Sequence, residues 1–120
     1  MSALAAAFQD LRSHGLSLPE AVEEMPWGHC ALKVRKKSFV FLNLDRETFS
    51  LSVKLPVSRD FALIFDWAEP TGYGLGRSGW VTGRFAEGDE IDLELLQRWI
   101  AESYRAVAPK KLAALLPTET

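Results

Sequence analysis

The chain has 120 residues, 48% of them hydrophobic and 25% charged, which is typical of a globular protein with one domain over residues 1–120. Its 14 basic and 16 acidic residues give a net charge of -2, which excludes a protein that coats nucleic acid through bulk positive charge. No run approaches the roughly 20 apolar residues of a membrane span, and the single cysteine, Cys30, excludes an internal disulfide and favours a cytoplasmic location.

The first half of the chain predicts one helix followed by strands. Leu4, Phe8 and Leu11 recur at helical spacing, which predicts a helix over residues 2–14 that stops at Gly15. Three strand-like runs follow, at residues 30–34, 38–44 and 48–55. They are joined by short turns, so we expect neighbouring strands to pair in an antiparallel sheet.

The second half predicts a short helix, a glycine-rich loop, a strand and a long amphipathic helix, at residues 59–67, 68–79, 80–85 and 92–107. We expect Phe61, Ile64 and Phe65 of the short helix to face the core. The order of elements predicts an α+β fold: an antiparallel sheet of about five strands, N- and C-terminal helices on one face, and a short helix before the last strand.

The glycine-rich loop contains the sequence GLGRSGWV at residues 74–81, which matches the pattern of phosphate-binding loops in kinases and dinucleotide-binding proteins. A dinucleotide site requires a strand before the loop and a helix after it, whereas here a helix precedes and a strand follows. The chain also lacks the catalytic motifs of a kinase. We therefore interpret the loop as a flexible connection, with a mobile gate beside a pocket as the alternative.

Residue chemistry gives little support for catalysis, a metal or a cofactor. His29 and Cys30 are neighbours, and neighbours on a strand point to opposite faces, so they do not form a nucleophile and base. Two histidines and one cysteine do not complete a four-ligand zinc site without carboxylates. We predict no catalytic residues, no metal site and no cofactor.

One face of the predicted sheet is basic. By the two-residue period of strands, the side chains that share the face opposite the core are Lys33, Arg35, Lys54, Trp80, Thr82 and Arg84. Lysine and arginine bind phosphates and aromatic rings stack on bases, so a DNA-binding surface is one hypothesis for this face, although the residues alone favour a solvated face. The hairpin tip Arg35, Lys36 and Lys37 would extend it. The alternative is a solvated face with Trp80 packed beneath a loop.

Five stretches in this order resemble the MmcQ/YjbR family of small bacterial proteins: LSLPEAVEEMPWGHCALKV, KSFVFLNL, LSVKLP, GYGLGRSGWV and WIAESYRAV. The resemblance covers about residues 8–112. It implies an α+β fold similar to that of bacterial frataxin (CyaY-like) and secretion chaperones. It also implies DNA binding through a proposed double-wing arrangement, or binding of a drug-like molecule, and it implies no known reaction.

The positions that match the family pattern are Trp27, Gly28, His29, Lys33, Lys54, Gly79, Trp80 and Tyr104. The chain departs from the pattern at Ser78, where many relatives carry histidine. The first hypothesis is therefore weak, salt-sensitive DNA binding through the basic sheet face and the hairpin tip. The alternative is a small-molecule or protein-binding module, also non-catalytic, with a pocket near Trp27, His29, Trp80 and Tyr104. The sequence leaves the oligomeric state open.

Overall fold

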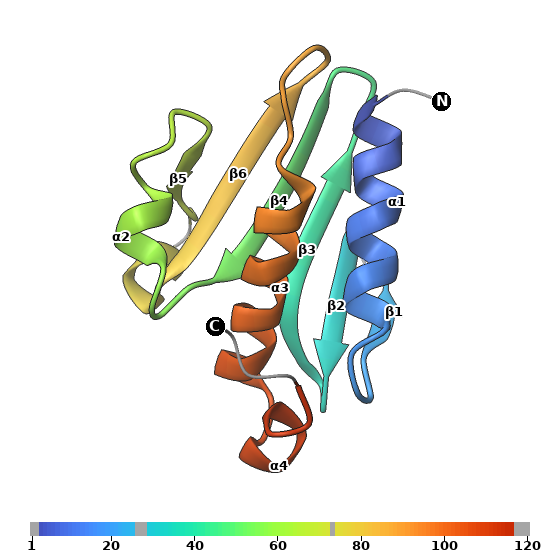
Figure 1. Cartoon of the computed structure of the whole chain (residues 1–120), viewed down its shortest axis with the longest axis vertical. Helices are drawn as coiled ribbons and strands as arrows, with labels where there is room; N and C mark the ends of the chain where they lie inside the picture. Colours follow the sequence, from blue (N-terminus) through green and yellow to red (C-terminus); the bar gives the residue numbers. More distant parts are fainter. Residues whose placement is uncertain (1–2, 26–28, 73, 117–120) are drawn as a thin grey trace.

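A computed structural model describes residues 3–25, 29–72 and 74–116 (Figure 1). The helices are α1 (Ala3–Leu16), α2 (Arg59–Ala62), the 3-10 helix η2 (Leu75–Ser78), α3 (Leu93–Val107) and α4 (Lys110–Ala113). The strands are β1 (Val22–Glu24), β2 (Cys30–Val34), β3 (Lys37–Leu44), β4 (Thr48–Lys54), β5 (Ala68–Pro70) and β6 (Trp80–Ala86).

All strand pairs are antiparallel, and the sheet order is β1-β2-β3-β4-β6-β5. This confirms the predicted α+β fold, although the sheet has six strands where about five were expected. The edge strands β1 and β5 have three residues each, too few to show a period of two. The sequence predicts only a turn-rich or irregular strand region at residues 16–30, where β1 lies, and a loop at residues 68–79, where β5 lies.

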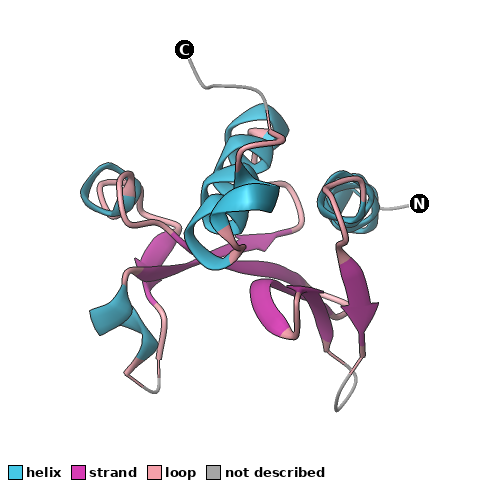
Figure 2. Cartoon of the chain, turned by 90° about the horizontal axis from the view of Figure 1, so that it is seen from below, coloured by secondary structure: helices cyan, strands magenta, loops and turns pink. Residues whose placement is uncertain are grey.

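The long helices cover one face of the sheet. Figure 2 shows α1 and α3 side by side above the strands, while η2 lies on the opposite side near one edge. On β4, Phe49, Leu51 and Val53 are completely buried toward the helices, and the intervening side chains are half-buried on the other face. The strict alternation in the sequence therefore predicts correctly which side of β4 meets the core.

Gly15 is a buried member of α1 and not its C-terminal stop, because the helix continues to Leu16. A Cβ atom at Gly15 would lie 2.4 Å from Cδ1 of Leu32, so the missing side chain lets α1 approach β2 closely. The helix ends at Leu16, and β1 begins at Val22 after a short connecting segment.

The predicted helix over residues 59–67 is shorter in the structure, because α2 ends at Ala62. Phe65 and Trp67 stack with their ring centroids 4.7 Å apart, and the ring of Trp67 lies 5.5 Å from that of Trp99 on α3. These rings fill the space beside α3. Phe61 and Ile64, which were expected to face the core, are instead 54% and 75% exposed.

The long helix α3 is hydrogen-bonded to two neighbouring strands of the sheet, β3 and β4. It begins where predicted, because the Asp92 side chain caps it by accepting a hydrogen bond from the Leu95 amide at 3.1 Å. Farther along, the buried Ser103 hydroxyl donates to the Phe39 carbonyl and accepts from the Lys54 amide at 2.8 Å. One side chain of α3 thus bridges β3 and β4 at the end where their ladder stops.

Candidate nucleic-acid interface

The strand register brings together four of the residues predicted for the basic face. On β4 and β6, Lys54 lies opposite Trp80, Ser52 opposite Thr82, and Ser50 opposite Arg84. Directly opposed residues project to the same side of a sheet. Lys54, Trp80, Thr82 and Arg84 therefore share the face that α1 and α3 leave uncovered (Figure 2).

Trp80 is a packing residue of this face. Its side chain is buried, with 8% of the residue exposed, and its ring lies 5.5 Å from that of Phe41 on β3. The neighbouring η2 contacts β6. Too little of the indole is accessible for a base to stack on it, so of the two roles expected for Trp80, stacking and packing, its burial fits packing.

Three of the predicted phosphate-binding residues have carboxylate partners. The ion pairs are Lys33 with Glu24 at 2.8 Å, Arg35 with Glu20 at 2.6 Å, and Arg84 with Glu69 at 2.8 Å. All three pairs reach solvent, so each contributes at most about 1 kcal/mol to stability. Their charges nevertheless cancel locally, which makes the sheet face far less positive than the spacing of lysine and arginine suggests.

The hairpin tip between β2 and β3 remains strongly basic. Lys36 and Lys37 are exposed, and within the described ranges neither forms an ion pair. Val34 pairs with Lys37, and the two residues between them have positive φ: 50° at Arg35 and 70° at Lys36. A two-residue hairpin with both central residues left-handed favours Asn-Gly, so arginine and lysine are held here in a costly conformation.

Replacing the tip with the residues that its backbone favours is expected to stabilise the fold. The double substitution Arg35→Asn/Lys36→Gly should raise the free energy of unfolding by about 1 kcal/mol, because relief of the left-handed strain exceeds the loss of an exposed ion pair. Urea denaturation measures this directly. Destabilisation would show that the two basic side chains make contacts that outweigh the strain.

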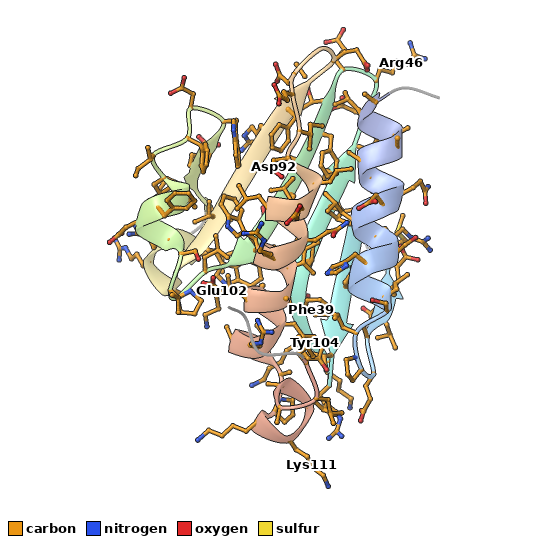
Figure 3. The ribbon with its side chains drawn as sticks, viewed as in Figure 1. Phe39, Arg46, Asp92, Glu102, Tyr104 and Lys111 are labelled. Atoms are coloured by element: carbon orange, nitrogen blue, oxygen red, sulfur yellow. The ribbon has the colours of Figure 1, made fainter. Side chains whose placement is uncertain are left out.

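A second basic pair lies at the same end of the molecule. Lys110 and Lys111 of α4 are exposed, and α4 lies with the hairpin tip at one end of the longest axis (Figure 1). Lys111 marks this end in Figure 3, and Arg46 marks the other. The sequence signal for this pair is the two adjacent lysines that follow Pro109.

Tyr104 does not line a pocket with Trp80. It is completely buried on the helix side of the sheet, where its ring packs edge-on against Phe39 at 5.2 Å (Figure 3). Its hydroxyl donates to the Pro19 carbonyl at 2.6 Å and so fixes the segment between α1 and β1. Burial raises the pKa of this phenol. Tyr104 therefore does not belong to the predicted pocket, because the sheet separates it from Trp80.

The other predicted pocket residues have varied positions. Trp27 and Gly28 lie outside the described residues. His29 is exposed, and its Nδ1 atom is hydrogen-bonded to Oδ1 of Asn43 on β3. Gly79 has a φ of 92°, and its carbonyl accepts from the Leu55 amide at 2.8 Å, so it turns the chain into β6.

Cys30 has no nucleophilic character in this environment. Its thiol is buried and donates to the Glu23 carboxylate at 3.1 Å, and burial followed by that hydrogen bond raises its pKa to about 12. Across the described part of the chain, no three side chains of the kinds that bind metals gather into a site. No described helix has the length and apolar character needed to cross a membrane.

The glycine-rich loop connects two antiparallel strands. It runs from β5 through η2 to β6, and left-handed glycines bound η2, with φ of 80° at Gly74 and 92° at Gly79. The buried Gly76 packs on Pro70, where a Cβ atom would approach within 2.8 Å. A strand follows the loop, so the helix N-terminus that holds a pyrophosphate in dinucleotide-binding proteins is not in place.

The fold and this surface define a small α+β protein with a two-faced antiparallel sheet. The chain belongs to the YjbR family, whose model matches residues 16–106. It is similar to the crystal structure of the Deinococcus radiodurans protein DR2400, which carries a DUF419 domain. The two are 26% identical, the match covers 82% of this chain and 75% of that one, and the TM-score is 0.65. No curated protein matches the chain.

Proposed function

We propose that the protein is a non-catalytic, cytoplasmic bacterial protein that binds DNA weakly through its basic end. This surface consists of Lys36 and Lys37 at the hairpin tip and Lys110 and Lys111 on α4. The observation that carries the proposal is the strained tip, where basic side chains occupy a turn whose backbone favours Asn-Gly. Strain retained at a surface turn is typical of functional sites.

The chemistry of the basic end suits phosphate binding. Lysine ammonium groups bind phosphates as mobile point charges, and such contacts position a protein on DNA without reading its sequence. Because the net charge of the chain is -2, affinity has to come from these few local contacts and should be low. Lys54, on the sheet face that α1 and α3 leave uncovered, would add a further phosphate contact. Lys33 and Arg84 on the same face are already ion-paired.

The alternative pocket near Trp27, His29 and Trp80 has weaker support. Trp80 is buried against Phe41, and Tyr104 lies on the other side of the sheet. His29 is exposed but already has Asn43 as a partner.

A pair of charge reversals tests the proposed surface. Lys37→Glu at the tip and Arg46→Glu change the net charge equally, and both residues are exposed. Figure 3 labels Arg46 at the end of the molecule opposite Lys111. We expect Lys37→Glu to weaken binding of labelled duplex DNA about 5- to 10-fold near 0.1 M salt, because one phosphate contact contributes about that factor to the affinity. Arg46→Glu should change it less than twofold. Fluorescence anisotropy measures both.

Equal losses in the two variants would indicate a general effect of charge and would contradict a local surface. The stabilised variant Arg35→Asn/Lys36→Gly adds a second check, because it should bind DNA more weakly while unfolding at higher urea concentration. A loss of binding in that variant cannot be attributed to damage to the fold.

A further inference from the structure

A groove of about 530 Å³ lies between α2 and α3, on the helix side of the sheet (Figure 1). One wall is formed by Val57 and Phe61, and the other by Leu95 and Trp99 of α3. Its volume falls within the range of known ligand sites. Val57 is 85% exposed and Phe61 is 54% exposed. Ile64, which lies outside the lining of the groove, is 75% exposed. A surface this apolar on a small domain typically marks a binding site.

The groove is preformed, because one side chain of α3 holds its opposite wall. The Glu102 carboxylate (Figure 3) accepts hydrogen bonds from the Val57 amide at 2.9 Å, the Ser58 amide at 2.9 Å and the Ser58 hydroxyl at 2.6 Å. The apolar residues of the wall are thus presented to solvent by a fixed backbone. A partner would bind without first having to order this segment.

The charges of the groove favour an acidic partner. Arg98 and Arg105 line it from α3, seven residues and therefore about 10.5 Å apart along one side of the helix. The acidic residue of the lining, Glu102, already directs both carboxylate oxygens at the backbone and hydroxyl groups of residues 57 and 58. Arg98 donates to Glu94 at 2.9 Å in an exposed pair, which exchanges at little cost.

We infer that the groove binds an acidic amphipathic helix of a partner protein. The apolar face of that helix would pack on Val57, Phe61 and Leu95, as in other helix-in-groove complexes. Carboxylates two turns apart on its flank would match the spacing of Arg98 and Arg105, because two parallel helices share the same rise per residue. The lining of the groove contains none of the four lysines of the basic end, so the inference does not depend on DNA binding.

Two designed peptides test it in fluorescence anisotropy. Both are helical with leucine on one face, and the other face carries glutamate in the first peptide and lysine in the second. We expect saturable binding of the glutamate peptide only, a loss of at least fivefold with Arg98→Glu, and loss of binding with Phe61→Ser. Phe61 is about half exposed but packs edge-on against Phe65 at 5.4 Å, so the variant should lower the urea midpoint slightly, and an unchanged affinity for DNA would show that the fold is retained.

Three outcomes would overturn the inference. The first is that the glutamate peptide shows no saturable binding, and the second is that both peptides bind equally well. The third is that Phe61→Ser leaves peptide binding unchanged. The control variant Arg46→Glu, remote from the groove, should bind the glutamate peptide as the unmodified protein does. Sedimentation velocity adds one more test, because a dimer abolished by Phe61→Ser would show that a second copy of the chain occupies the groove.

Discussion

Replacing Ser103 with alanine is expected to lower the free energy of unfolding by about 3 kcal/mol. The Ser103 hydroxyl is completely buried, donates to the Phe39 carbonyl and accepts from the Lys54 amide. Alanine would leave both backbone groups buried without a partner, and each unsatisfied group costs about 1–3 kcal/mol. The effect is large because these groups lie where the β3–β4 ladder ends and no strand residue replaces the lost bonds.

Urea denaturation followed by circular dichroism measures this loss as a lower midpoint with an unchanged slope. Ser50→Ala is the matched control, since Ser50 is half-buried on the uncovered face of β4. It should change stability by no more than about 0.5 kcal/mol. Equal effects of the two substitutions would contradict the bridging role of Ser103.

Stability is also expected to fall steeply in acid because of one ion pair between α1 and β1. Arg12 donates two hydrogen bonds of 2.6 Å to the Glu23 carboxylate, and the Cys30 thiol adds a third at 3.1 Å. The Arg12 hydrogen bonds lower the pKa of Glu23 to about 2, against the opposing effect of its partial burial.

The direction of the pH dependence follows from the lowered pKa. In the unfolded chain Glu23 titrates near 4.5, so above that pH it is ionised in both states and the pair contributes fully. As the pH falls from about 5 to about 2, the unfolded chain takes up the proton first and the contribution is lost. Because Arg12 is partly open to solvent, we expect a loss on the order of 2 kcal/mol.

Two neighbouring substitutions isolate this contribution in urea titrations at several pH values. Glu23→Gln should flatten the profile below pH 5 relative to the unmodified protein. Glu24→Gln, on the next residue, removes a carboxylate that is itself exposed and pairs with Lys33, and it should retain the original slope. If both variants lose the slope equally, the pH dependence belongs to the carboxylates in general and not to the Arg12–Glu23 pair.

The sequence predicts well the elements that have a strong hydrophobic period. The helices α1 and α3 and the strands β2, β3, β4 and β6 lie where periodicity placed them, within a few residues. The bounds of β1 were not predicted and β5 was predicted as loop, because three residues pair only when the rest of the sheet is present. The end of α1 was misplaced, because the close approach of Gly15 to Leu32 is a tertiary contact.

The same two strands explain the error about the basic face. Alternation correctly grouped Lys54, Trp80 and Arg84 on one side of the sheet. The acids that neutralise Lys33 and Arg84 are Glu24 on β1 and Glu69 on β5, and they become partners only through strands that the pattern does not reveal. Sequence could place the positive charges on a face, but it could not place the negative charges beside them.

The groove between α2 and α3 could not be predicted from the sequence for a similar reason. Helical spacing showed that Phe61, Ile64 and Phe65 belong to an amphipathic segment, but spacing alone does not decide which of them meet the core. The stacked rings of Phe65 and Trp67 fill the space beside Trp99, and Phe61 and Ile64 are left exposed. Aromatic side chains compete for one site, and only their three-dimensional packing decides the result.

The most direct test of the proposed function is the salt dependence of DNA binding by the unmodified protein. Anisotropy titrations with labelled single- and double-stranded DNA would be run at about 50 and 200 mM salt. Three or four lysine–phosphate contacts predict that duplex affinity falls roughly 40- to 150-fold over this range. No saturable binding at the lower salt, or binding that hardly changes with salt, would contradict a DNA-binding function for the basic end.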